Sequence, residues 1–329
     1  MSKPVINIVA DIGGTNLRIA SLDSEGKCQY IQTYQCKEHP SLRSVIEDYL
    51  KKSEIDSSKS LVNACLAIAC PVDQDLIHMT NLPWSFSKAK LKNDLGLHAL
   101  HMINDYTAMA WSINELDEWQ KVKIGGGEPV QHKPIGICGP GTGLGVANLI
   151  WGNGQWISVD GEGGHTDFAP TNDQEVAILS YLREKYSRVS YEQVLSGLGI
   201  EQIYQALCHV SDVETNNYSA ADISKRAIDK SCDICLEAML QFCKTLGSFA
   251  GNMALHTSAF GGIYIAGGIV PRFLEFFEES GFRRRFEAKG RFTHFNAKIP
   301  TYVITESQPG LLGASAYLTQ QNINEGLCR

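Results

Sequence analysis

The stretch ADIGGTN, Ala10–Asn16, stands between an apolar, β-branched run at Val5–Ala10 and a second strand-like run at Leu17–Leu22. This order predicts two strands joined by a tight Gly-Gly turn. Glycines also let a backbone turn bring its N–H groups against phosphate oxygens, and Thr15 could add a hydroxyl donor. Asp11 could hold a water of hydrated Mg²⁺. A hairpin turn of type I′ or II′ needs glycine as well, so both interpretations stand on this stretch alone.

A second stretch repeats the arrangement. GPGTGLG, Gly139–Gly145, lies between the strand-like runs Ile135–Cys138 and Val146–Ile150. Neither turn has the G-x-x-x-x-G-K-[ST] pattern of a P-loop, and neither is a G-x-G-x-x-G that opens a helix, as dinucleotide sites require. Two facing strand–turn–strand units can instead grip a nucleoside triphosphate between two domains. The repeat predicts a duplicated α/β fold with a nucleotide cleft between its halves.

Other runs predict the elements around these turns. Ser41 is a preferred cap for an amphipathic helix that reaches Lys52. Strands are expected at Cys28–Gln35, Leu61–Ala69, Gln155–Val159, Gly262–Ala266 and Ile299–Ile304, and helices at Tyr106–Leu116, Gln174–Lys185, Ser231–His256 and Leu311–Thr319.

The domain boundary is expected at Gly125–Lys133, where three consecutive glycines and a proline form a loop. We therefore predict a smaller α/β domain at residues 1–130 and a larger one at 131–329. The closing C-terminal helix could return to the first domain.

The bulk composition excludes several classes. A chain of 329 residues is too long for one ordinary core. A net charge of −7 disfavours nucleic acid as a partner. No apolar run approaches the roughly 18 residues of a membrane span, and no signal peptide is visible, so we expect a cytoplasmic protein. The ten cysteines are interpreted as buried hydrophobes, because Cys232-x-x-Cys235 lacks a second Cys/His pair for zinc.

Asn104 and Asp105 follow the short apolar run Ala99–Ile103. A carboxylate at a strand end could accept a proton from a substrate hydroxyl, which typically contributes about 10²–10⁴ in rate. Asp is also a preferred helix cap, and without context Asp105 as the cap of the next helix is the simpler interpretation.

Two further glycine pairs carry candidate residues. Glu162-Gly-Gly-His165 could present a carboxylate and an imidazole to vicinal sugar hydroxyls, although a lone His165 is more often a structural residue. No third ligand suggests a metal there. Gly267-Gly268, before a helix start at Pro271, could receive a ribose or an α-phosphate, but close strand–helix packing also requires glycine.

Taken together, these segments resemble the bacterial glucokinase family within the actin/hexokinase/heat-shock-chaperone superfamily. The resemblance runs from about Ile6 to Leu318. It rests on the motifs ADIGGTN, LPW, IND, GPGTGLG, EGGH, SYEQVLSG, IAGGIVPRF and PGLLGA.

The resemblance implies ATP and D-glucose as substrates, Mg²⁺ as cofactor, transfer to the sugar 6-hydroxyl, and a homodimer. It assigns Asp105 as the base. The sugar is expected to contact Asn104, Asp105, Glu162, His165 and Glu192, a residue that its own sequence surroundings do not mark. The nucleotide is expected to contact Ala10, Asp11, Ile12, Gly13, Gly14, Thr15, Gly141, Thr142, Gly143, Gly267 and Gly268. No protein side chain is expected to bind the metal directly, and Asp11 would reach it through water.

One difference from related sugar kinases indicates which branch of the family this chain resembles. Related repressor/ORF/kinase proteins carry a cysteine-rich zinc loop after the Gly-His pair, whereas this chain has no cysteine between His165 and Cys208. It therefore resembles the zinc-free branch. Mannose, fructose and glucosamine remain alternative sugars at this stage. A nucleotide-switched structural or chaperone-like ATPase and a catalytically inactive sugar sensor remain alternative functions.

Overall fold

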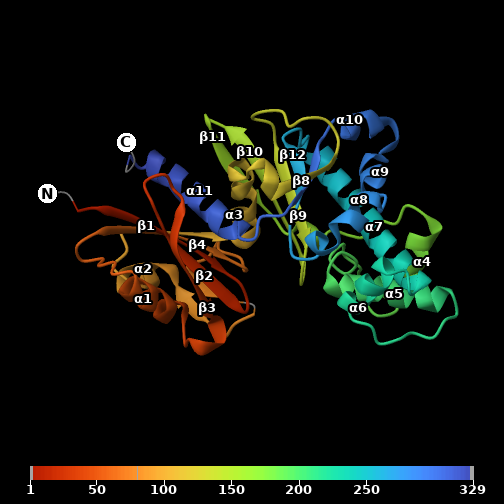
Figure 1. Cartoon of the computed structure of the whole chain (residues 1–329), viewed down its shortest axis with the longest axis horizontal. Helices are drawn as coiled ribbons and strands as arrows, with labels where there is room; N and C mark the ends of the chain where they lie inside the picture. The colour runs from red at the N-terminus through yellow and green to blue at the C-terminus, as the bar shows by residue number, and fades with distance from the viewer. Residues whose placement is uncertain (1–2, 80, 327–329) are drawn as a thin grey trace. The chain divides into compact units, whose positions relative to one another are not determined.

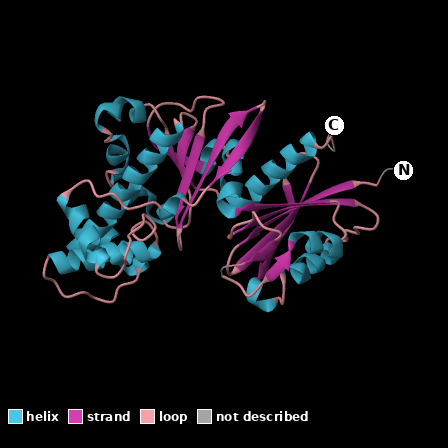
Figure 2. Ribbon diagram, turned by 180° about the vertical axis from the view of Figure 1, so that it is seen from behind, coloured by secondary structure: helices cyan, strands magenta, loops and turns pink. Residues whose placement is uncertain are grey.

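The computed structural model describes residues 3–79 and 81–326. The chain forms two compact units, the first made of residues 1–117 and 306–329 and the second of residues 118–305. The first unit therefore contains both ends of the chain. Figure 1 colours the chain by residue number, so the first unit contains both the red segment and the blue C-terminal helix, and Figure 2 distinguishes helices from strands.

The first unit is built on a five-stranded sheet in the order β3-β2-β1-β4-β7. Strands β1, β4 and β7 are parallel, and β2 and β3 run antiparallel to form a meander with β1. The bounds are β1 Val5–Ile12, β2 Asn16–Leu22, β3 Cys28–Gln35, β4 Leu61–Ile68 and β7 Ala99–Asn104. A short hairpin, β5 Leu76–His78 with β6 Ser85–Ser87, lies apart from this sheet.

Helices cover both faces of this sheet (Figure 1). Alternate residues of β1 point to opposite sides, so Ile8 packs with α1 (Leu42–Lys52) and α2 (Lys88–Asp94) in one core. Val9 packs with α3 (Asp105–Ser112) and α11 (Pro309–Asn324) in the other. The C-terminal helix thus completes the first unit.

The second unit repeats the topology. Its six-stranded sheet has the order β11-β10-β9-β12-β13-β8, in which the first five strands reproduce the meander and two parallel strands of the first sheet. The bounds are β8 Lys121–Gly125, β9 Ile135–Pro140, β10 Leu144–Gly152, β11 Gln155–Asp160, β12 Gly262–Ile265 and β13 Thr301–Ile304. The predicted duplication of an α/β fold is confirmed.

The helices of the second unit gather around α7, Asp233–Thr257, whose apolar face is central to the largest core cluster. They are α4 Asp173–Arg183, α5 Gly197–Val210, α6 Ala220–Ile228, α8 Leu274–Glu279, α9 Phe282–Glu287 and α10 Thr293–Ala297. Cys235 is buried in this core without a disulfide, and burial raises the pKa of its thiol to about 12. Of the helices that the structure describes, none has the length and apolarity to cross a membrane.

The expected boundary near residue 130 differs from the division at residue 117. Strand β8 pairs antiparallel with β13, so residues 121–125 contribute to the second sheet. The glycines of Gly125–Lys133 indicate a loop, but they do not mark the division between the two units. Gly126 is instead held against the backbone of Ile299, where an added Cβ would lie 2.2 Å from the carbonyl oxygen.

Candidate active site

The first glycine turn connects β1 to β2 and closes with a hydrogen bond from Gly13 N–H to the Asn16 carbonyl, 3.0 Å long. Neither Gly13 nor Gly14 has a positive φ, so the type I′ or II′ interpretation is wrong. A Cβ at Gly13 would come no closer than 3.4 Å to another part of the chain. Local folding therefore does not require glycine at this position, which favours a loop that receives a ligand.

Asp11 lies beside this turn, directly opposite Arg18 in the β1–β2 pair. Arg18 Nη1 is 3.7 Å from Asp11 Oδ2. Burial raises the pKa of the Asp11 carboxyl, and the Arg18 charge opposes that rise. Gly310, in the first turn of α11, packs so closely that an added Cβ would lie 2.7 Å from Asp11 Cγ. The carboxylate is therefore fixed between a strand and a helix start.

Asn104, not Asp105, caps the helix that follows β7. Its side-chain oxygen accepts a hydrogen bond from Tyr106 N–H at 2.9 Å, and Asp105 is the first residue of α3. The interpretation of Asp105 as the cap was wrong because the neighbouring Asn104 has the extended backbone that an N-cap requires. Asp105 Oδ1 also accepts from Tyr106 N–H, at 3.0 Å.

Strand register brings the two candidate segments of the first unit to one edge. Ile12 pairs with Ile68 across β1 and β4, and Ile68 pairs with Asn104 across β4 and β7. The carboxyl ends of the three parallel strands are therefore level. Two strand spacings separate the glycine turn from Asn104, which is about 10 Å.

The second glycine turn, between β9 and β10, is packed against several other segments of the second unit. Gly141 N–H donates to the Gly143 carbonyl at 2.8 Å, and the Gly141 carbonyl accepts from Gly197 N–H at 2.9 Å. Gly267, with φ +83°, would place a Cβ 2.5 Å from the Pro140 carbonyl oxygen. Glycine at 267 is thus required both by the backbone conformation and by close approach.

Glu192 connects this turn to the segment Glu162–His165, the sugar loop. Its Oε2 accepts a hydrogen bond from Leu144 N–H at 2.9 Å, and its Oε1 lies 3.9 Å from His165 Nδ1. A Cβ at Gly143 would lie 2.5 Å from Oε2, so the glycine makes room for the carboxylate. The residue that the sequence left unmarked is therefore the one that joins the two predicted motifs.

Gly163–His165 forms a short 3-10 turn that follows Glu162 and packs against β10. Gly164 lies so close to Leu144 that an added Cβ would be 2.1 Å from its carbonyl oxygen. The Gly164 carbonyl accepts from Glu192 N–H at 2.9 Å. Arg188 donates to the His165 carbonyl and to Asp167 Oδ1. His165 and Glu162 are exposed, so both side chains are accessible to a ligand.

Gly268 follows Gly267 at the end of β12, and the nearest atom to an added Cβ is Arg272 Nη2 at 4.0 Å. The helix expected to start at Pro271 is a 3-10 turn, Val270–Phe273, which leads into α8. Gly268 therefore has room beside it, whereas the neighbouring Gly267 is closely packed. The second glycine turn has the same contrast between Gly141 and Gly143.

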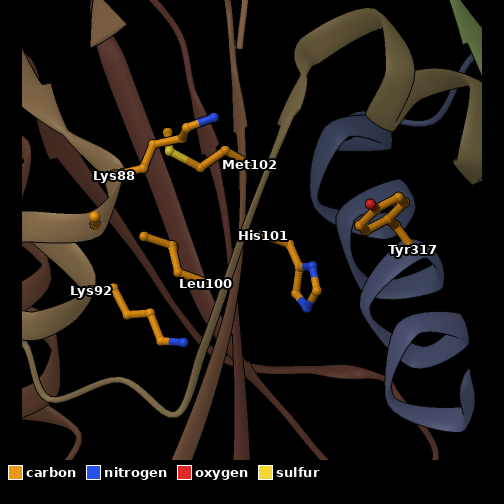
Figure 3. Close-up of a pocket in the computed structure, with 7 residues that line it drawn as sticks. Lys88, Lys92, Leu100, His101, Met102 and Tyr317 are labelled. Atoms are coloured by element: carbon orange, nitrogen blue, oxygen red, sulfur yellow. The ribbon is translucent and has the colours of Figure 1, made fainter. Parts of the chain in front are cut away.

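Within residues 3–79 and 81–326, no group of three or more His, Cys, Asp or Glu side chains is arranged to hold a metal ion. A pocket of about 320 Å³ runs along β7 in the first unit and is lined by Lys88, Lys92, Leu100, His101 and Tyr317, among others (Figure 3). It includes none of the predicted site residues.

Comparisons with known proteins agree with this geometry. A family model described as Glucokinase matches residues 8–321. A glucokinase of Colwellia psychrerythraea is 58% identical over 321 residues, covering 96% of this chain and 97% of that protein. A glucokinase of Photorhabdus laumondii is 48% identical over 316 residues, covering 95% and 97%.

Solved structures give the same result. A glucokinase from an Antarctic psychrotroph is 36% identical and superposes with a TM-score of 0.88, covering 96% of this chain and 99% of that one. A ROK-family glucokinase from Streptomyces griseus, solved with glucose and AMPPNP, is 18% identical with a TM-score of 0.60 over 96% and 99%. At that identity the likeness concerns the fold alone.

Proposed function

The chain belongs to the glucokinase family, and from that premise we propose how it phosphorylates glucose with ATP. The proposal assigns the transferred phosphoryl group to the sugar 6-hydroxyl. Asp105 accepts the hydroxyl proton as the new O–P bond forms. Asn104, Glu162, His165 and Glu192 hold the remaining sugar hydroxyls.

The observation that carries this proposal is the position of Glu192. A single carboxylate contacts the second glycine turn through Leu144 N–H and faces His165 of the sugar loop. Phosphoryl transfer depends mainly on positioning the acceptor against the phosphate and on neutralising charge. Glu192 contacts both the second glycine turn and the sugar loop, so it can fix the position of the sugar relative to the phosphate.

The nucleotide is assigned to the two glycine turns, Ala10–Thr15 and Gly141–Gly143, and to Gly267-Gly268 for the adenosine. A Cβ added at Gly13, Gly141 or Gly268 would come no closer than 3.4 Å to another atom, so packing within the chain does not require these glycines, which fits loops that a phosphate or ribose approaches. Mg²⁺, when bound, neutralises phosphate charge. Asp11 would hold it through water, and its fixed, partly exposed carboxylate is a suitable hard oxygen donor.

Two further properties belong to the proposal. We assign the enzyme to the cytoplasm, because the nine cysteines in the described residues form no disulfide. We also assign it a homodimeric state, as the resemblance implies.

The first experiment is a coupled assay of ADP release with and without glucose. ADP release that requires glucose supports the kinase, whereas glucose-independent ATP hydrolysis would indicate a nucleotide-switched ATPase. No release under either condition would indicate a sugar sensor. Mannose, fructose and glucosamine in place of glucose measure how selectively the sugar hydroxyls are read.

The Asp105→Ala variant tests the assigned base. Losing a general base reduces kcat by about 10² or more. The helix should persist because Asn104 still caps it. Glucose phosphorylation retained within about threefold would remove Asp105 from the mechanism.

A further inference from the structure

The Cys232-x-x-Cys235 pair has no part in the proposed sugar chemistry, and it lies at the start of α7. Cys232 is the N-cap residue of this helix, and Cys235 is its third residue. Both are free thiols. Within the described residues, no third His, Cys, Asp or Glu completes a metal site with them. A structural zinc site has four protein ligands, so the pair is not explained as one.

The start of α7 differs from the starts of the helices before it. Helices α1 to α6 each begin with a Ser or Asn whose side chain accepts a hydrogen bond from a backbone N–H of the first turn. The Cys232 side chain makes no such bond, although its carbonyl accepts from Leu236 N–H at 3.0 Å. The helix that is central to the largest core therefore begins without a side-chain cap.

The N-cap and third positions of a helix are the two that a capping box connects. Helix α6 shows this contact in the same protein, because the Oγ of its N-cap Ser219 donates to Asp222 Oδ2 at 2.6 Å. Cys232 and Cys235 occupy the equivalent positions of α7. Burial raises the pKa of the Cys235 thiol, and a hydrogen bond with the Cys232 thiol raises it further. The two sulfurs therefore lie side by side in the first turn.

The two thiols differ in accessibility. Cys235 is completely buried, whereas Cys232 is half-buried. Among the nine cysteines that the structure describes, Cys28 is the other half-buried one, and the remaining seven are buried. In a Cys-x-x-Cys pair, an accessible first thiol can react with an external oxidant, and a protected second thiol can then displace it.

We propose that Cys232 and Cys235 form a reversible thiol–disulfide site, and that the disulfide takes the place of the missing cap of α7. The oxidant is a small disulfide such as glutathione disulfide. The Cys232 thiolate attacks one of its sulfurs, so that a mixed disulfide forms and one glutathione leaves. The Cys235 sulfur then attacks the Cys232 sulfur and releases the second glutathione. The protein loses two electrons and two protons, and glutathione disulfide becomes two glutathione thiols.

The fold favours the second step. The first turn of α7 holds the two thiols together, and well-oriented intramolecular reactions reach effective concentrations of about 10⁵–10⁸ M. Such a concentration offsets the small thiolate fraction of Cys235. In a reducing cytoplasm, a disulfide of this kind is typically transient, and reduced glutathione reverses it.

The disulfide should leave catalysis unchanged. Asn252 of α7 donates to the Tyr191 hydroxyl at 3.4 Å, and Tyr191 precedes the assigned sugar ligand Glu192. Asn252 lies about 25 Å along the helix from Cys235, at about 1.5 Å per residue. The proposal does not depend on which sugar the enzyme uses, and glucose phosphorylation serves as the measure of correct folding.

Peptide mapping tests the disulfide. The enzyme is incubated with glutathione disulfide, its remaining thiols are alkylated under denaturing conditions, and it is digested with trypsin. The peptide Ser231–Lys244 contains Cys232, Cys235 and Cys243. After oxidation it should carry an alkyl group on Cys243 alone. After treatment with reduced glutathione, all three of its cysteines should be alkylated.

Three variants assign the two thiols. Cys235→Ala should retain glutathione on Cys232, because no second thiol displaces it. Cys232→Ala should leave Cys235 unmodified, because Cys235 is buried. Cys28→Ala is the matched control, since it removes the other half-buried thiol, and its Cys232–Cys235 disulfide should form as in the wild type. All three variants should phosphorylate glucose within about twofold of the wild-type rate.

Hydrogen exchange tests the effect on the helix. The Leu236 amide bonds to the Cys232 carbonyl, so its exchange rate reports opening of the first turn. Oxidation should slow this exchange about tenfold, which is a small effect for a disulfide. The proposal is overturned if the wild type keeps glutathione on Cys232 or stays reduced. A disulfide that includes Cys243, or an unchanged exchange rate at Leu236, would also overturn it. Loss of phosphorylation by the reduced wild type would count against the proposed function alone.

Discussion

At the scale of single residues, glycine is needed at position 143 because of a neighbouring side chain and not because of its own backbone conformation. Its φ is not positive, so alanine could adopt the conformation. The Glu192 carboxylate, however, occupies the space where a Cβ would stand, with Oε2 2.5 Å away. The glycine-rich character of the second turn therefore has two origins, because Gly141 has open space and Gly143 has a carboxylate beside it.

This difference predicts opposite effects for two alanine variants of one loop. Gly143→Ala should displace Glu192 from Leu144 N–H, raise the KM for glucose about tenfold, and lower the free energy of unfolding by about 1–3 kcal/mol. Gly141→Ala meets no atom closer than 4.0 Å, so unfolding should change by less than about 0.5 kcal/mol. Its effect should appear in the KM for ATP.

Steady-state kinetics with each substrate and urea unfolding separate the two variants. Equal effects on the glucose KM would contradict the assignment of Glu192 as the group that Gly143 accommodates. An unchanged ATP KM in Gly141→Ala would contradict phosphate binding at that glycine.

Lys289 gives a pH-dependent prediction. Burial lowers the pKa of its ammonium group from 10.5 to about 8, although Nζ donates to the Ser248 carbonyl and to Asn252 Oδ1. Between about pH 8 and 10.5 the unfolded chain binds this proton and the folded protein does not. Stability therefore gains a contribution that rises with pH across this window and is absent below it.

The measurement compares melting temperatures of wild type and Lys289→Met between pH 7 and 10.5. The difference between the two should change across this window, with the wild type gaining relative to the variant. A pH-independent difference would mean that Lys289 keeps an ordinary pKa in the folded protein. The comparison is needed because the buried cysteines titrate in the same range with the opposite sign.

The contact of Glu192 with the second glycine turn could not be predicted from the sequence. Its partner Leu144 is 48 residues away, and neither residue lies in a local pattern that predicts the contact. The glycines at 143 and 164 were visible, but the sequence cannot tell a glycine that admits a carboxylate from one that admits a phosphate. Only the resemblance to known kinases assigned Glu192 a role.

At the scale of elements, α3 joins a structural role and an assigned binding role in one residue. Asn104 caps the helix with its side-chain oxygen, and the amide NH₂ group of the same side chain can still donate to a sugar hydroxyl. The helix start therefore fixes the side chain that the proposal assigns to the substrate.

Two substitutions separate these roles. Asn104→Ser keeps a good N-cap and loses the amide donor, whereas Asn104→Ala loses both. Both variants should raise the KM for glucose to a similar extent. Only Asn104→Ala should lower the free energy of unfolding, by about 1 kcal/mol relative to Asn104→Ser. Similar stability of the two variants would show that the cap contributes little.

Local patterns predicted most elements well. The apolar runs at Val5 and Leu61 became the buried strands β1 and β4, and Ser41 caps α1 by accepting from Ser44 N–H. Strand β8 was missed because its Lys-Val-Lys pattern is too short and polar to indicate a strand. The segment is a strand only because it pairs with β13. Whether such a short segment forms a strand depends on a pairing partner that is distant in the sequence.

At the scale of the whole molecule, α11 attaches the end of the chain to its beginning. Asn322 of α11 donates to Asn7 of β1 at 3.1 Å and accepts from Asn63 of β4 at 3.0 Å. Asn63 and Asn322 are almost fully buried, so this polar network is specific to one placement of the helix.

Removing one member of the network should destabilise the first unit. Asn322→Ala leaves the buried Asn63 and the half-buried Asn7 with fewer partners, and should lower the free energy of unfolding by about 1–3 kcal/mol. Asn324→Ala, in the same helix but exposed, is the matched control and should change little. Urea unfolding measures both, and equal effects would show that the network does not stabilise the helix.

The composition of the first unit from both chain ends has a consequence for biosynthesis. A ribosome makes the strands of the first sheet early, but it makes the helix that covers Val9, Ala20 and Ile103 only after residues 118–305. The second unit is continuous from residue 118 to 305 and is fully synthesised before that helix. The nascent chain therefore exposes an apolar face until that helix is made, and the unit that starts first is completed after the second unit.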